Sequence, residues 1–210
     1  MNNFSEFSLT AYDLSILHDK AFFEAKHQIM HKWEQFLTHL AQKIQEWASF
    51  VNQITLPDEV KQTTPKISKG ENYQGMPYMV LDYPRYFGKE DTCAFRNILL
   101  WNRGLYSTWL FEGKYMDYAV QNYKQYGSSS MYLHQNEDKW VHELTPQDIY
   151  IQTPESFYCE TLLEKTKEKL HYLKFSNFVS FQEWNILEQR SGLPLPVSSA
   201  FHALMNFIYG

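Results

Sequence analysis

The chain has 210 residues, of which 44% are hydrophobic and 17% aromatic, and its formal net charge is −5 at pH 7. This length suffices for a substantial core and favours one domain over residues 1–210. Interspersed acidic and basic residues argue against a nucleic-acid partner, and no run approaches the roughly 18 apolar residues of a membrane-spanning helix.

The first twenty residues lack a charged segment followed by an apolar one, so we expect no secretory signal and a cytoplasmic location. The two cysteines, Cys93 and Cys159, lie far apart in the chain. We therefore expect reduced, mostly buried thiols rather than a disulfide.

A turn around Asp13–Leu17 precedes the strongest periodic pattern, which covers residues 19–51. Asp19 is a suitable helix N-cap, and apolar residues recur after it mostly at steps of three and four: Phe23, Met30, Trp33, Leu37, Leu40, Ile44, Trp47 and Val51. Phe22, Ile29 and Phe36 widen this stripe. The pattern predicts a long helix packed across a sheet. Pairing with a second copy is the lesser alternative, because a coiled coil needs a narrower seam, so the chain is expected to be a monomer or a homodimer.

Residues 66–87 contain the first predicted strand. The apolar and aromatic run Met76–Tyr83 predicts a strand that ends at Pro84. Alternation places Tyr78, Val80 and Asp82 on one face of it. The polar stretch 66–75 contains two glycines and predicts a loop able to fold over a ligand.

Further strands follow up to residue 144. The runs Phe95–Trp101 and Leu105–Phe111 flank Asn102-Arg103-Gly104, which predicts a β-hairpin. Residues 114–126 predict a short surface helix. Met131–Leu133 and Trp140–Leu144 predict a second hairpin with a polar tip.

The last part of the chain predicts helices over residues 153–209. Thr153-Pro154-Glu155 is the start of a helix that should run to about Tyr172, and Ser180 with Glu183 forms a capping box for another helix. The final segment has Phe201, Leu204, Met205 and Ile208 on one face. The order of elements predicts an α+β fold, with a mainly antiparallel sheet of about five strands over 76–144 packed by the N-terminal and C-terminal helices.

No motif assigns a reaction, a metal or a cofactor. Glu24, His27 and His31 have metal-ligand spacing on a helix, yet at about 100° per residue they point away from the apolar stripe. Cys93 with His134 or His142 lacks any local catalytic signature. The Gly-x-Ser-x-Gly motif of a nucleophile elbow and the residue order of a Walker A phosphate-binding loop are both absent from the sequence. No catalytic residue, metal ligand or cofactor is therefore assigned.

The candidate ligand-binding residues are the polar and aromatic side chains around the first strand: Lys69, Glu71, Asn72, Tyr73, Tyr78, Asp82, Arg85 and Arg96. Asp82 and Arg85 are expected to form a local ion pair. Such a cluster is typical of a pocket for a small anionic or aromatic ligand, and equally of a polar network that pins a loop to a sheet.

The biological function and the partner stay open at this level, and three classes compete. The first is a non-catalytic domain that binds a small ligand or a protein around residues 66–96. The second is an enzyme with Asp82 as acid or base and Arg85 and Arg96 as an anion clamp. The third is a structural subunit, for which a wide exposed apolar patch on the long helix or the last helix would be the sign.

Overall fold

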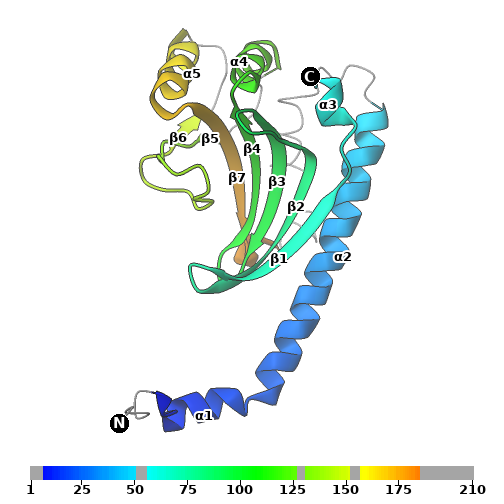
Figure 1. Cartoon of the computed structure of the whole chain (residues 1–210), viewed down its shortest axis with the longest axis vertical. Coiled ribbons are helices and arrows are strands. Elements are labelled where there is room, and N and C mark those ends of the chain that lie inside the picture. Colours follow the sequence, from blue (N-terminus) through cyan, green and yellow to red (C-terminus); the bar gives the residue numbers. More distant parts are fainter. Residues whose placement is uncertain (1–6, 51–55, 127–130, 152–156, 185–210) are drawn as a thin grey trace.

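The computed structural model describes residues 7–50, 56–126, 131–151 and 157–184 of the chain (Figure 1). Its helices are α1 Ala11–Leu17, α2 Lys20–Phe50, α3 Asp58–Lys61, α4 Tyr115–Tyr126 and α5 Phe157–Leu170. Its strands are β1 Lys66–Tyr73, β2 Met76–Phe87, β3 Thr92–Leu100, β4 Gly104–Glu112, β5 Met131–Leu133, β6 Ile149–Ile151 and β7 Tyr172–Ser180. Among the described residues, no helix combines the length and the apolarity needed to cross a bilayer.

The strands form one antiparallel sheet in the order β1-β2-β3-β4-β7-β5-β6. The first four follow the chain and are joined by tight connections. Asn102 has a positive φ of 60° in the predicted turn between β3 and β4, as hairpin turns require. The α+β class and the antiparallel sheet are confirmed, but the sheet has seven strands rather than about five.

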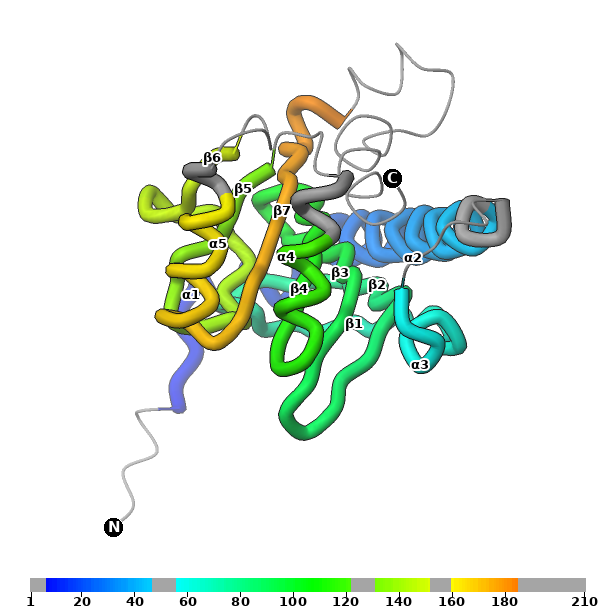
Figure 2. Tube along the Cα trace, turned by 90° about the horizontal axis from the view of Figure 1, so that it is seen from above, coloured from blue at the N-terminus to red at the C-terminus, as the bar shows by residue number. Residues whose placement is uncertain are grey.

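One cluster of buried apolar side chains joins one face of the sheet to α2, α3, α4 and α5. Trp109 is stacked between Phe95 and Phe111, with ring centroids 4.8 and 5.6 Å apart. Helices α4 and α5 contact each other. Figure 2 shows from above that both helices lie near one end of the strands of the sheet. Helix α4 forms where the sequence predicts a short surface helix, with Tyr115 and Ala119 buried in the cluster and Asp117 and Gln121 exposed.

Helix α2 packs on the sheet along only part of its length. The Asp19 carboxylate accepts the backbone N–H of Phe22 at 2.9 Å, which confirms the predicted N-cap. The predicted stripe is buried at Trp33, Leu37 and Ile44. Towards the N-terminus the helix extends past the sheet to α1 (Figure 1), and there Phe22 and Phe23 are each 47% exposed.

Residues 66–73 form the edge strand β1 and not the predicted loop. Lys66 and Ser68 lie opposite Asp82 and Val80 of β2. An edge strand that is covered on few sides needs few apolar residues, so its polar composition resembled that of a loop. Strand β2 in turn continues past Pro84 to Phe87, because the register shifts between Asp82 and Arg85 and a proline is tolerated at such an irregularity.

The second predicted hairpin is also wrong. β5 pairs with β6 rather than with residues 140–144, and residues 135–148 connect the two strands. We call these residues the covering loop. Residues 172–180, which the sequence left between two helices, form β7 between β4 and β5. Its alternation of Leu173 and Phe175 with Lys174 and Ser176 puts polar groups on one face, and that lowered its apolar signal.

The C-terminal helices are only partly described. α5 ends at Leu170, two residues before the predicted end. Ser180 and Glu183 form the predicted capping box, since the Ser180 N–H donates to Glu183 Oε2 at 3.0 Å and the Glu183 N–H donates to Ser180 Oγ at 3.3 Å. The predicted start at Thr153-Pro154-Glu155 and the helices predicted beyond residue 184 lie outside the described residues.

We expect Leu37→Ala to lower the free energy of unfolding by about 2–5 kcal/mol, because it opens a cavity where α2 meets the sheet. Gln35→Ala, on the exposed side of the same helical turn, serves as the control and should change it by less than about 0.5 kcal/mol. Chemical denaturation of both variants measures the difference. Equal effects would mean that this turn of α2 does not contact the sheet.

Candidate functional site

A row of polar side chains crosses the sheet on the face turned away from α2. The strand register pairs Asp82 with Arg96, Arg96 with Thr108, and Thr108 with Ser176. Opposite residues of antiparallel strands point to the same face. Residues far apart in the chain are thus brought into one row that runs from β2 to β7.

Hydrogen bonds link the members of this row in two groups. Arg96 donates to both carboxylate oxygens of Asp82, from Nε at 2.7 Å and from Nη2 at 3.0 Å. The hydroxyls of Thr108 and Ser176 are 2.8 Å apart, and Ser176 Oγ lies 2.7 Å from His134 Nε2. Asp82 is buried and fully engaged, so the predicted ion pair with Arg85 is replaced by one with Arg96.

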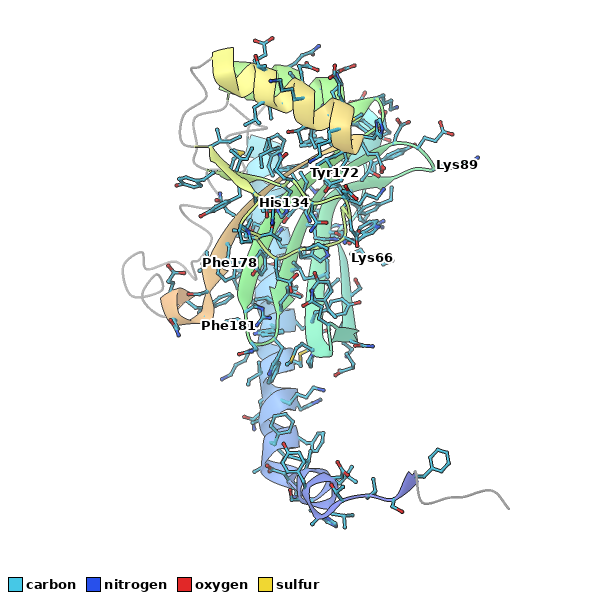
Figure 3. The ribbon with its side chains drawn as sticks, turned by 90° about the vertical axis from the view of Figure 1, so that its left-hand side faces the viewer. Lys66, Lys89, His134, Tyr172, Phe178 and Phe181 are labelled. Carbon is cyan, nitrogen blue, oxygen red and sulfur yellow. The ribbon has the colours of Figure 1, made fainter. Side chains whose placement is uncertain are left out.

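The covering loop lies over this polar row. Figure 3 views the sheet from the side opposite α2, and the loop crosses that face after the labelled His134. Lys174 Nζ donates to the carbonyls of Lys139, at 3.1 Å, and Val141. Tyr73 accepts the His142 N–H at 2.9 Å and donates to Glu143 Oε2 at 2.5 Å. The sheet therefore supplies the hydrogen bonds that hold the loop in place.

The guanidinium of Arg96 is also enclosed by aromatic rings. Its central carbon lies 5.2 Å from the centroid of Trp140 in the covering loop and 5.6 Å from that of Phe87 in β2. These distances are within the range of cation–π attraction. Asp82 and the two rings hold the guanidinium in one orientation, and its Nη1 has no hydrogen-bond partner among the described residues.

A pocket of about 200 Å³ opens beside Arg96 on this face. Flat aromatic rings, aliphatic side chains and a few polar groups line it: Ser68, Tyr73, Tyr78, Val80, Arg96, Ile98, Trp140 and His142. A smaller hollow of about 10 Å³ lies next to it, and Arg96, Trp140 and His142 border both. An apolar cavity of about 150 Å³ can hold benzene, so the pocket can hold one ring with small substituents.

Burial keeps the imidazoles beside the pocket neutral. It lowers the pKa of both His142 and His134 to about 2, and the nearby positive charge of Lys174 adds to the effect. The Nδ1 atoms of both rings are buried without a hydrogen-bond partner among the described residues. His134 Nδ1 lies 3.6 Å from Asp148 Oδ2, which is too long for a hydrogen bond. Each unpaired ring nitrogen is therefore a polar group buried at a cost to stability.

Four of the eight predicted site residues meet at or beside this pocket. Three of them line it, namely Tyr73, Tyr78 and Arg96. The fourth, Asp82, holds Arg96 in its orientation. The other four lie elsewhere. Lys69 is opposite Met79 on the α2 side, and Glu71 pairs with Lys26 of α2 at 2.5 Å. Asn72 Oδ1 accepts the Gly75 N–H in the turn at 3.0 Å. Arg85 Nε donates to the Thr64 carbonyl at 3.2 Å.

The sequence reasoning missed Trp140, His142 and Lys174. The first two were assigned to a strand, so no interpretation placed them over the sheet. The run Trp140-Val141-His142-Glu143-Leu144 has the aromatic and β-branched residues of a strand, so the local pattern gave no signal against that assignment. Lys174, between Leu173 and Phe175, is a lysine inside an apolar run, which indicates a buried amine with specific partners.

The other chemical groupings do not come together. Cys93 is on the α2 face of the sheet, where burial raises the pKa of its thiol, whereas His134 and His142 lie on the opposite face. Glu24, His27 and His31 are exposed on α2, as predicted, with Glu24 paired to Lys20 at 3.2 Å. Within the described ranges, no group of three His, Cys, Asp or Glu side chains is placed to hold a metal ion.

Comparisons of the chain with protein-family models, with curated proteins and with solved structures find no match. Function must therefore be argued from the geometry of the pocket and not from a relative.

We expect Arg96→Met to lower the free energy of unfolding by about 3–5 kcal/mol, because it leaves the Asp82 carboxylate buried and unpaired. Adding Asp82→Leu should recover most of this loss, since the unpaired charge is then removed. Arg103→Met, at an exposed arginine of the β3–β4 turn, is the control. Denaturation curves of the four proteins test this, and a double variant less stable than Arg96→Met would contradict it.

The buried amine of Lys174 should make stability depend on pH. Burial lowers its pKa to about 8, against about 10.4 in an unfolded chain. Below pH 8 both states are protonated and the penalty of burying the charge is complete. Between pH 8 and 10 the folded state loses the proton first, so stability rises with pH.

Relative to Lys174→Met, the wild-type free energy of unfolding should therefore increase by roughly 2 kcal/mol from pH 8 to pH 10. The subtraction removes the contributions of other titrating groups. A difference that stays constant over this range would show that Lys174 is not desolvated.

Proposed function

We propose that this protein is a ligand-binding domain whose pocket takes a small, neutral, planar ring that carries a carbonyl group. The observation that supports it is the 200 Å³ pocket that Arg96 and His142 line together with the aromatic side chains Tyr73, Tyr78 and Trp140. Apolar walls with a few convergent polar groups are typical of small-molecule sites.

The charge balance favours a neutral ligand over an anion. The positive charge of Arg96 is compensated by Asp82 in a bidentate pair, and Glu143 lies next to Tyr73 at the pocket wall. A carboxylate ligand would meet these two carboxylates, whereas a carbonyl oxygen can accept from Arg96 Nη1 without adding a charge. The N–H donors of a guanidinium bind neutral acceptors as well as ions.

The shape of the lining favours a flat ring. Tyr73 packs edge-to-face on Tyr78 with centroids 6.2 Å apart and lies 5.5 Å from the His142 ring. Trp140 borders the same pocket from the covering loop. Aromatic groups pack favourably in stacked or edge-to-face geometry, and a thicker saturated ring would not match these surfaces.

The same geometry argues against acid–base catalysis by Asp82. Both of its oxygens accept from Arg96, so neither is free to take a substrate proton. The neighbouring imidazoles bind protons only in strong acid because of their burial, and a general base works best with a pKa near the working pH. Binding without a reaction is the simpler use of these residues.

Benzamide is a suitable probe, because it is neutral, planar and has about nine non-hydrogen atoms. We expect a dissociation constant of about 1 mM, which corresponds to roughly −4 kcal/mol and a reasonable value per atom. Benzoate tests the charge and cyclohexanecarboxamide tests the planarity, and each should bind at least tenfold more weakly. NMR titrations that follow the backbone amide and the tryptophan indole N–H signals of the ¹⁵N-labelled protein give these constants.

Trp140→Ala should weaken benzamide binding at least tenfold while leaving the fold intact, since this side chain is 43% exposed. Tyr150→Ala, which removes a comparably exposed ring (48%) outside the pocket, is the matched control and should bind as the wild type does. No binding of benzamide at 10 mM, about ten times the expected constant, would refute the proposal, as would equal binding by Trp140→Ala. Tighter binding of benzoate would refute the preference for a neutral ligand.

A further inference from the structure

The N-terminal part of the described chain carries large apolar side chains that are exposed. We call residues 7–32, which comprise α1 and the first turns of α2, the projecting arm. Figure 1 shows it extending away from the sheet. Its exposed large apolar residues are Phe7, Leu9, Tyr12, Leu14, Ile16, Leu17, Phe22, Phe23 and Ile29. Exposed apolar clusters of this kind mark interaction sites in folded proteins.

Helix α1 indicates that the arm is built to be covered. It has only seven residues and none of them is buried. Yet Thr10 and Asp13 give it a complete capping box, with the Thr10 N–H donating to Asp13 at 2.7 Å and the Asp13 N–H donating to Thr10 Oγ1 at 3.1 Å. Helices shorter than about 12 residues are marginal in water without packing. A capped short helix with an uncovered apolar surface is therefore expected to pack against a partner.

The exposed part of α2 continues the surface that binds the sheet. At about 100° per residue, Phe22, Phe23 and Ile29 point to the same side of the helix as buried Trp33 and Leu37. The core covers this side from Met30 onwards, and Lys26 reaches Glu71 at the edge of the sheet. Before that point the same apolar side has no covering element among the described residues. The apolar side of α2 that is available to a partner thus continues directly from the side that packs on the core.

The charges of the arm favour a protein partner over a membrane or a nucleic acid. Its three carboxylates, Asp13, Asp19 and Glu24, are balanced by Lys20, Lys26 and Lys32. Helices that lie on lipid surfaces carry an excess of lysine and arginine on their polar face, and nucleic acids demand the same excess. Two copies of a balanced arm do not repel each other.

The area of the arm matches what a symmetric dimer needs. The nine side chains expose roughly 900 Å², if a large apolar residue presents about 200 Å² when fully exposed. Two arms that covered all of these side chains would bury about 1,800 Å², an upper limit that is within the range of stable interfaces. In a twofold arrangement each apolar group is used in both copies, so the α1 of one copy can cover the α2 surface of the other.

We infer that the projecting arm binds the projecting arm of a second copy of this chain, forming a twofold-symmetric homodimer. The inference is independent of the proposed ligand, because the arm and the pocket use different residues.

Two measurements on the full chain test the dimer. Sedimentation equilibrium from about 1 to 100 µM should give twice the chain mass, and Phe22→Glu combined with Phe23→Glu should raise the dimer dissociation constant at least 100-fold, because each arm then buries added charges. Met76→Glu places one such charge at an apolar residue of similar exposure (41%) outside the arm and should leave the dimer unchanged. Circular dichroism checks that all variants are folded.

A photoreactive benzoylphenylalanine at position 22 identifies the occupant. In an equal mixture of ¹⁴N- and ¹⁵N-labelled protein, we expect cross-linked peptides that join residues 7–32 of differently labelled copies. A monomer at all concentrations would overturn the inference, as would a dimer unaffected by the two glutamates. Cross-links confined to one copy, for instance to its own residues 185–210, would overturn it too.

Discussion

The bidentate ion pair between Asp82 and Arg96 is the contact on which the polar face of the sheet depends. A guanidinium and a carboxylate at the centre of a sheet are tolerable only when they satisfy each other, because each loses its hydration there. Their pairing also decides the chemistry. It uses both oxygens of Asp82, compensates the two charges and fixes the plane of the Arg96 guanidinium.

The polar row of the sheet supplies the hydrogen-bond partners that the covering loop needs. A loop laid over a sheet brings peptide carbonyls and N–H groups into a buried space, where they need partners. Lys174 supplies donors to two carbonyls and Tyr73 accepts one N–H. The polar cluster around β2 can therefore both hold the covering loop in place and line a pocket. The pinned loop carries Trp140 and His142, and these two side chains form the outer wall of the cavity.

The sequence predicts those parts of the fold that local pattern determines. The N-cap at Asp19, the β3–β4 hairpin and the Ser180 capping box depend on neighbours in the chain, and each is found. Strand β1 pairs with β2, the next strand in the chain, and escapes prediction because an edge strand can be as polar as a loop. The half-polar strand β7 escapes prediction, because its hydrogen bonds come from β4 and β5, which are far away in sequence. The pocket was half predicted for the same reason. Tyr73, Tyr78, Asp82 and Arg96 lie near one another along the chain, whereas Trp140, His142 and Lys174 reach them only through the insertion of β7 and the closure of the loop.

Strand β1 connects the two surfaces to which we assign a role. Because its side chains alternate, Ser68 faces the pocket while Glu71 turns to the other side and binds Lys26 of α2. Tyr73, at its end, holds the backbone of the covering loop. An edge strand has a hydrogen-bonded neighbour on one side only, so β1 is held by β2 and by these side-chain contacts on both of its faces. The polar composition that makes β1 hard to predict from sequence is therefore the composition that these contacts require.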